Sequence, residues 1–202
     1  MLQEPIASYS PESKPFGLTY GQWTVKWWQW LTSIPTGTNP AVDEDGHNAA
    51  VNQNDPYVWF LAGTFVRRNA MRNCVVPASK AILFPVINYQ MNSIESPELK
   101  DEFELTEHVR QDEDDIVSLK AVIDGQKLPI YRVRSDPLMF QINVPEDNPF
   151  AIAGGGSIKT TADGYWVFLK PLTPGEHYLD FAGACAAGAR SVAAVYNLTS
   201  SD

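Results

Sequence analysis

The residues best suited to hold a metal ion lie in the segment Asp43-Glu44-Asp45-Gly46-His47-Asn48. Calcium in proteins is bound by several oxygen ligands, which a tight turn at glycine can gather from one short loop. If this segment belonged to an EF-hand, the first and twelfth positions would be Ala41 and Asn52, which lack the required carboxylates. The segment is therefore not an EF-hand. A looser calcium site that uses Asp43 and Asp45 is one interpretation, and a solvated polar loop is the other.

The histidines could act as metal ligands or proton-transfer groups only if the fold brought them together. His47, His108 and His177 are far apart in the sequence, and none belongs to an HxH or HExxH motif. His177 alternates with Leu179 and Phe181, so a β-strand there would direct all three side chains to one face. This pattern favours a hydrogen-bonded core histidine over a metal ligand.

Motifs of nucleophilic and nucleotide chemistry are absent from the sequence. There is no GxSxG segment, and Gly154–Thr161 lacks the Gly-Lys-Ser/Thr ending of a phosphate-binding loop. The acidic cluster Asp112–Asp115 is typical of a solvated surface. A polysaccharide hydrolase or lyase stays an alternative, because a β-sandwich can bring two catalytic carboxylates together from separate strands.

The charge of the chain disfavours several classes of partner. The 202 residues include 15 Lys and Arg against 24 Asp and Glu, which gives a net charge of −9. We therefore expect no binding to nucleic acid or to anionic membrane surfaces. No segment approaches the ~18 apolar residues of a transmembrane helix, so we expect a protein that does not span a membrane.

Two features bear on the cellular compartment. Met1–Pro5 has neither the basic nor the apolar region of a signal peptide. This is consistent with a cytoplasmic protein or with the mature part of an exported one. Cys74 and Cys185 could form one disulfide or stay two buried thiols, so they leave the compartment open.

Four of the six tryptophans lie within eight residues, and they mark the first element that could position a site. Thr19 and Gln22 fit a capping box, and Pro35 ends the segment, so we predict a helix over 19–34. Trp28 lies off the apolar face of this helix and is our candidate for binding a glycan or a lipid. The apolar face, which we expect to pack in the core, carries Tyr20, Trp23, Trp27, Trp30, Leu31 and Ile34.

Most of the remaining chain has the pattern of short strands joined by turns. We predict a mainly β fold, an antiparallel jelly-roll-like β-sandwich of about nine strands with two helical insertions. The second helix is expected at 97–110, with Ser96 as its N-cap. Hairpins are expected around Asp124-Gly125 and across 171–175, and Pro85 indicates a bulge or an edge position. The predicted strands are 58–63, 73–76, 81–88, 117–123, 126–132, 138–144, 165–170, 176–181 and 191–198.

The chain is predicted to contain one folded domain. Residues 1–18 are polar and include three prolines, which indicates an extended arm laid on the surface. Residues 19–202 would form a single β-sandwich domain, because no repeat or linker interrupts them. The arm could instead add to the sheet of a second copy, which would make the protein a homo-oligomer.

Several segments resemble, in the same order, those of an uncharacterised family of bacterial and archaeal secreted proteins. The most specific is Tyr20–Pro35, which contains YGQWTVKWWQW and fits the pattern YGxWxxxWWQW. The resemblance extends from about residue 18 to the C-terminus. It implies an extracytoplasmic β-sandwich and supplies no established activity. The other similar segments are Val58–Gly63, Val76–Asn88, Val122–Gly125, Tyr131–Ser135 and Asp163–Leu172.

The polar residues in these segments are the candidates for a shared site. They are Asn88, Arg132 and Asp163, followed by His177 and joined by Asp43. Each also has a structural interpretation: Asp163 in a turn, Arg132 in an ion pair, and Asn88 at the end of a strand.

The resemblance also bears on the cysteines. It implies further cysteines near Ala49 and after Tyr89, positions that are not cysteine here. Cys74 is therefore expected to lack its usual disulfide partner.

Three functions are consistent with these observations. The first is a non-catalytic extracytoplasmic protein that binds a glycan or another cell-surface component, with calcium as the candidate cofactor. The second is a polysaccharide-acting hydrolase or lyase, and the third is a subunit of an extracellular assembly. The ligand-binding candidates are Trp28, Asn88, Arg132, Asp163 and His177, and the metal candidates are Asp43 and Asp45.

Overall fold

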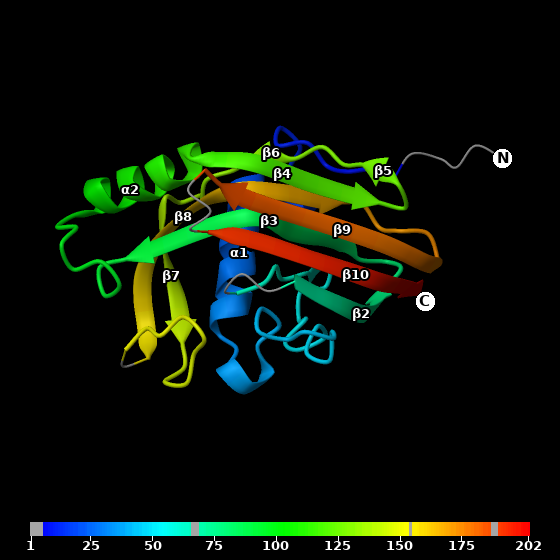
Figure 1. The fold of residues 1–202 in the computed structure, drawn as a ribbon, viewed down its shortest axis with the longest axis horizontal. Helices are drawn as coiled ribbons and strands as arrows, with labels where there is room; N and C mark the ends of the chain where they lie inside the picture. The colour runs from blue at the N-terminus through cyan, green and yellow to red at the C-terminus, as the bar shows by residue number, and fades with distance from the viewer. Residues whose placement is uncertain (1–5, 66–68, 154, 187–189) are drawn as a thin grey trace.

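Two packed β-sheets and two α-helices make up the computed structural model, which describes residues 6–65, 69–153, 155–186 and 190–202 (Figure 1). The first sheet has the order β1-β3-β8-β6, with β7 also paired to β8, and the second sheet has the order β2-β10-β9-β4-β5. The mainly β prediction is confirmed. The strands are β1 (Val58–Phe60), β2 (Asn69–Pro77), β3 (Ala81–Asn92), β4 (Ile116–Ile123), β5 (Gln126–Lys127), β6 (Tyr131–Arg132), β7 (Met139–Val144), β8 (Gly156–Leu169), β9 (Gly175–Cys185) and β10 (Ser191–Ser201).

Both sheets are mixed, so the prediction of a purely antiparallel sandwich is wrong. β1 runs parallel to β3, and β10 runs parallel to β2. Between β1 and β3 the chain passes through β2, which belongs to the other sheet. The chain therefore reverses twice before it returns to the first sheet, and β3 enters in the direction of β1.

One of the two predicted hairpins is correct. Asp124 and Gly125 both have positive φ, 50° and 80°, as a two-residue hairpin turn requires, and β4 pairs with β5 around them. The strand predicted at 126–132 is instead split into β5 and β6, which lie in different sheets. The hairpin predicted across 171–175 is wrong, because this loop carries the chain from β8 in the first sheet to β9 in the second.

The tryptophan-rich segment forms α1 (Tyr20–Thr32), as predicted. The capping box is present: Gln22 N donates to Thr19 Oγ1 over 3.1 Å, and Thr19 N donates to Gln22 Oε1 over 2.9 Å. α1 packs on the outer face of the first sheet, where its predicted apolar stripe is buried together with Phe60, Leu83 and Trp166. A second core, which includes Phe84, Phe181 and Tyr196, lies between the two sheets.

The second helix, α2, spans Glu102–Asp114, so its predicted start at Pro97 is wrong. The N-cap is Asp101, whose Oδ1 accepts from Glu104 N over 2.9 Å. Ser96 lies in a turn instead, where its backbone N donates to Asn92 O. α2 buries Leu105 and Val109 against Met91 at the far end of β3. Within the described ranges, neither helix is long and apolar enough to cross a membrane.

Residues 6–18, the described part of the N-terminal arm, pack on the β-sandwich of the same chain. Tyr9 N donates to Phe168 O over 2.8 Å, and Lys170 N donates to Ala7 O over 2.9 Å, so the arm follows the end of β8. A one-turn 3₁₀-helix at Pro15–Gly17 then leads into α1, and another lies at Thr36–Thr38. Residues 1–5 lie outside the described part of the chain.

Candidate functional site

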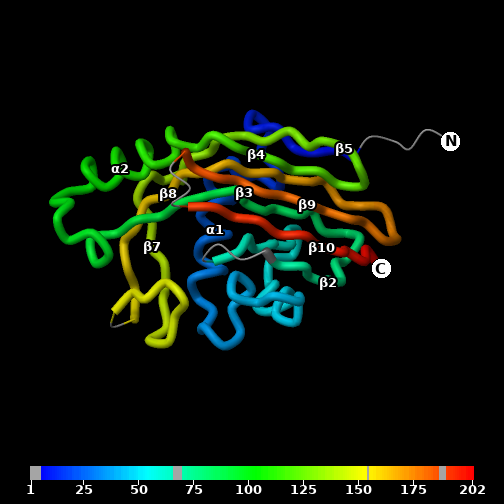
Figure 2. Tube along the Cα trace, in the orientation of Figure 1, coloured from blue at the N-terminus to red at the C-terminus, as the bar shows by residue number. Residues whose placement is uncertain are grey.

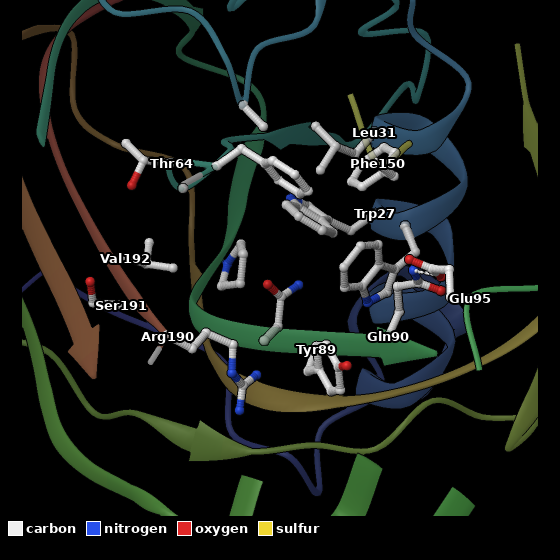
Figure 3. A pocket seen from close by; sticks show the side chains of 16 residues that line it. Trp27, Leu31, Thr64, Tyr89, Gln90, Glu95, Phe150, Arg190, Ser191 and Val192 are labelled. Atoms are coloured by element: carbon white, nitrogen blue, oxygen red, sulfur yellow. Dashed lines mark hydrogen bonds between the residues drawn. The ribbon is translucent and has the colours of Figure 1, made fainter. Parts of the chain in front are cut away.

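A cavity of about 400 Å³ lies between α1, β3 and the start of β10 (Figure 3). Its position follows from the short length of β1, which pairs only with Ala81–Leu83 of β3. Beyond Leu83, no strand pairs with this edge of β3 in the described chain, and the edge borders the cavity. Aromatic side chains form much of the wall: Trp27, Trp28, Phe65, Tyr89 and Phe150. Cavities of this size and character are typical of small-molecule binding sites.

Trp28 contributes an unpaired hydrogen-bond donor to this wall. The side chain is only 5% exposed, and its Nε1 has no hydrogen-bond partner. The neighbouring Trp27 differs, because its Nε1 donates to Leu61 O over 2.9 Å. A buried donor without a partner costs about 1–3 kcal/mol. Trp28 thus brings an unpaired donor to the cavity wall, and a ligand would reach this donor once the ring turns toward the cavity.

Asn88 contributes a second unpaired donor from β3. A bulge between Pro85 and Ile87 precedes it, which confirms one of the two predicted roles of Pro85. Asn88 lies opposite Gly164 on β8, where a Cβ atom would come within 2.5 Å of Asn88 Cβ. Glycine at position 164 therefore makes room for Asn88. The Nδ2 atom of Asn88 is buried and has no partner.

The carboxylate of Glu95, at the same cavity, accepts hydrogen bonds from two side-chain amides. Gln90 Nε2 donates to Glu95 Oε2 over 2.7 Å, and Asn92 Nδ2 donates to the same oxygen. Partial removal from water raises the pKa of Glu95, and these two hydrogen bonds oppose the shift. Figure 3 shows Gln90 and Glu95 side by side at one end of the cavity. Among the lining residues of the described chain, Glu95 is the one carboxylate.

Arg190 lies at the opposite end, next to Ser191 and Val192 (Figure 3). Its guanidinium lies 4.7 Å from the centre of the Tyr89 ring. Nη1 donates to Glu113 Oε1 over 2.5 Å, and Nη2 donates to Asp112 O over 3.0 Å. Burial raises the pKa of Glu113 to about 7, although the charge of Arg190 opposes the shift.

The structure brings two of the predicted ligand-binding residues, Trp28 and Asn88, to this cavity. Arg132 and Asp163 contact each other away from the cavity. Asp163 directly precedes Gly164, the partner of Asn88 on β8, so the Asp163 side chain points to the face of the sheet opposite to that of Asn88. Arg132 Nη2 contacts Asp163 Oδ2 over 2.9 Å, and Arg132 Nη1 contacts Asp114 Oδ1 of α2 over 2.5 Å.

The surroundings of Arg132 and Asp163 fit a structural role that holds α2 on the sheet. Desolvation lowers the pKa of Arg132, but the hydrogen bonds with Asp163 and Asp114 outweigh it, so the pKa rises above its usual value. Asp163 is buried within strand β8, so its predicted location in a turn is wrong. Arg132 forms the ion pair that its structural interpretation predicted.

His177 belongs to β9, contacts the turn between β4 and β5, and lies outside the cavity. Its Nδ1 is 2.7 Å from Asp124 Oδ2, and its Nε2 is 2.8 Å from Thr173 O. The residue is buried, as predicted for a hydrogen-bonded core histidine. Desolvation lowers its pKa, but the contacts with Thr173 and Asp124 outweigh this effect and raise it.

Asp43 and Asp45 belong to a loop that covers the outer edge of β2. Met71 N donates to Glu44 O over 3.2 Å, and Asn73 N donates to Asp45 O over 2.9 Å. The Asp43 carboxylate accepts three backbone amides, from Asp45, Gly46 and Asn48. No group of three or more metal-ligating side chains occurs in the part of the chain that the structure describes. Calcium binding by this loop stays a prediction.

Two structural points complete the comparison with the sequence. Cys74 and Cys185 are not joined by a disulfide, and Cys74 is buried. The sequence interpretation also missed Gln90, Glu95 and Arg190. A signal for Gln90 existed, because Asn88 and Gln90 are polar residues two apart in an apolar strand and so share one face. No local pattern connects this strand with Arg190.

No family model, no curated protein and no solved structure matches this chain. The resemblance to a secreted-protein family therefore stays a prediction.

Proposed function

We propose that this protein is a non-catalytic binding protein whose cavity between α1 and β3 takes a sugar unit of a glycan or of another cell-surface component. The observation that carries the proposal is the pair of unpaired donors, Trp28 Nε1 and Asn88 Nδ2, at one cavity. Both donors are closed to solvent in this structure, so an oxygen-rich ligand would pair with them after each side chain turns toward the cavity.

The character of the wall supports a sugar over a purely apolar ligand. The apolar C–H face of a sugar ring packs on aromatic side chains such as those of Trp28 and Tyr89. Its hydroxyl groups both accept and donate hydrogen bonds. They can therefore accept from Trp28 and Asn88, whose donors a hydrocarbon ligand would leave unpaired, and can add a donor to the Glu95 carboxylate.

A catalytic function has less support. Glycoside hydrolysis commonly uses two carboxyl groups, on either side of the scissile bond. The described cavity wall supplies one, that of Glu95. Glu113 interacts with Arg190 instead, and the cavity wall does not include it.

The extracytoplasmic location is part of the same proposal, with support from the Tyr20–Pro35 resemblance. The jelly-roll relationship and a calcium ion at Asp43 and Asp45 also stay predictions. Fractionation of the native host checks the location. Calorimetric titration with calcium checks the ion, and its absence would leave the sugar site as proposed.

The deciding experiment is a glycan-array screen followed by calorimetry with three proteins. The wild type is expected to bind one class of glycan, and Trp28→Phe, which removes only one donor and part of the ring, is expected to weaken binding about tenfold. Trp166→Phe is the matched control, because Trp166 is also buried with an unpaired Nε1 but lies outside the cavity wall. Equal losses in both variants, or no glycan binding by the wild type, would contradict the proposal.

A further inference from the structure

One face of the second sheet carries no covering layer in the described chain. The first sheet lies between α1 and the second sheet, and α2 packs at the far end of β3. Figure 1 and Figure 2 show β9 and β10 side by side, with no helix crossing in front of them. An uncovered sheet face is unusual when it is apolar, because such a patch on a soluble protein often marks an interaction surface.

The strand register identifies the residues that point outward. Ala194, Tyr196 and Leu198 of β10 are buried between the sheets, so the alternate residues face out. Val195 lies opposite Met71 of β2 and Asp180 of β9. Met71, Val75 and Tyr178 are 62%, 61% and 48% exposed, which is high for large apolar side chains. We call this surface the open face. Its apolar members are Met71, Val75, Val122, Tyr178, Ala182, Ala193 and Val195, and they lie among polar residues such as Asn73, Asn197 and Thr199.

The open face carries no net charge, in a chain whose net charge is −9. Its described strands contribute Lys120 and Lys127, which balance Asp180 and Glu176. Lys120 Nζ also forms an ion pair with Asp180 Oδ2 over 2.5 Å. Two copies of an acidic protein repel each other over most of their surfaces. The open face is therefore a surface through which two copies can approach without that repulsion.

The size of the open face fits a dimer. β2, β4, β9 and β10 have 9, 8, 11 and 11 residues. With ~3.3 Å per residue and ~4.8 Å between strands, they span roughly 600 Å². Two such faces in contact bury about 1,200 Å² in total, which is the lower limit for a stable specific interface.

Two copies could also associate by adding a strand to the edge of the second sheet, but the edge at β2 is covered. Glu44 O and Asp45 O accept from Met71 N and Asn73 N on the outer edge of β2, so a neighbour cannot add a strand along this part of the edge. The described part of the N-terminal arm pairs with β8 of its own chain. Packing of one flat face on another, as in a β-sandwich, avoids both obstacles.

We propose that the open face is the docking surface for a second copy of this chain, which produces a two-fold dimer with sheet packed on sheet. Val195 lies near the middle of the interface, and Met71 lies at its border. This proposal is independent of the sugar site, because none of the apolar members of the open face lines that cavity, and of the outward residues of β10 only Ser191, at its start, does so.

Sedimentation equilibrium over a wide range of protein concentrations tests the dimer. The wild type is expected at twice the chain mass, and Val195→Lys is expected at the chain mass, because like charges would meet across the two-fold axis. Met71→Lys is the second variant, since a residue already 62% exposed tolerates lysine in the fold. An equal mixture of Val195→Lys and Val195→Glu is expected to restore the dimer.

The control is Phe103→Lys on α2, where Phe103 is 72% exposed and lies outside the open face. This variant is expected to stay dimeric, and circular dichroism checks that every variant is folded. A wild type that is monomeric at all concentrations would overturn the proposal. So would a Met71→Lys protein that is folded and as dimeric as the wild type. A monomer that binds neutral lipid vesicles would assign the face to a membrane surface instead.

Discussion

Trp28 of α1 and Asn88 of β3 line one cavity, and each has a buried donor without a partner. The adjacent Trp27 lines the same cavity with its Nε1 bonded to Leu61 O. Two neighbouring tryptophans of one helix therefore differ in a single respect that bears on binding. This difference allows stability and binding to be separated by one type of substitution.

Without ligand, Trp28→Phe is expected to change the free energy of unfolding less than Trp27→Phe. Both substitutions remove the same atoms, but only the second leaves a buried carbonyl, Leu61 O, without its donor. We expect a difference of about 1–2 kcal/mol between the two variants. Urea denaturation measures it. Equal destabilisation would show that Trp28 Nε1 is already satisfied in the free protein.

Arg72 is expected to be essential for stability. Its side chain is fully buried and donates to Asp43 O, Ala62 O and Gly63 O and to the hydroxyl of Tyr196. Arg72→Met removes the arginine donors from Asp43 O and Gly63 O, while Ala62 O keeps its hydrogen bond from the Tyr196 hydroxyl, so we expect a loss of about 3 kcal/mol or more.

The control for this prediction is Arg110→Met, because the ion pairs of Arg110 with Glu107 and Asp114 are partly exposed. It is expected to cost less than about 1 kcal/mol. Chemical denaturation compares the two variants. Similar losses would contradict the structural role of Arg72.

Glu113→Gln is expected to gain stability relative to the wild type as the pH rises. The folded carboxyl group has a pKa of about 7, against 4.5 without burial. Between these values the folded protein holds a proton that the unfolded chain has released. Wild-type stability therefore falls as the pH rises through this window, by roughly 2–3 kcal/mol. Glutamine does not titrate, so its curve lacks this fall.

Denaturation at pH 5 and pH 8 measures the effect. Glu107→Gln serves as the control, since Glu107 is partly exposed in its ion pair with Arg110. The two variants should differ mainly at pH 8. Parallel pH profiles for Glu113→Gln and the wild type would argue against a raised pKa.

The contact between His177 and Asp124 is expected to stabilise the protein at acidic pH. The folded pKa of His177 is raised, so its contribution is complete below the unfolded pKa of about 6.5 and is lost as the pH rises through the folded pKa. Asp124→Asn keeps an oxygen that can accept from Tyr178 N but removes the charge. We expect it to lower stability by about 1 kcal/mol at pH 5.5 and by less at pH 8.5. Urea denaturation at both pH values tests this, and a loss independent of pH would contradict it.

Local patterns were sufficient for part of the candidate site. The capping box and the helical spacing predicted α1, and Trp28 was singled out because it lies off the main stripe. Asn88 was selected through the resemblance alone. Gln90 was missed although it shares a strand face with Asn88, and Glu95 follows that strand. Arg190 was missed because the cavity joins residues that are about 160 positions apart in sequence.

By itself, the sequence determined the local elements: a helix at Tyr20–Thr32 capped by Thr19, a turn at Asp124-Gly125 and strands at most of the predicted positions. These depend on hydrogen bonds and side-chain periods that span only a few residues. The tertiary structure alone decided which sheet each strand joins, and so which strands run parallel. It also decided that Trp28 and Asn88 meet at a cavity while Arg132 and Asp163 point away. Such pairings depend on packing between distant segments, which no local pattern encodes.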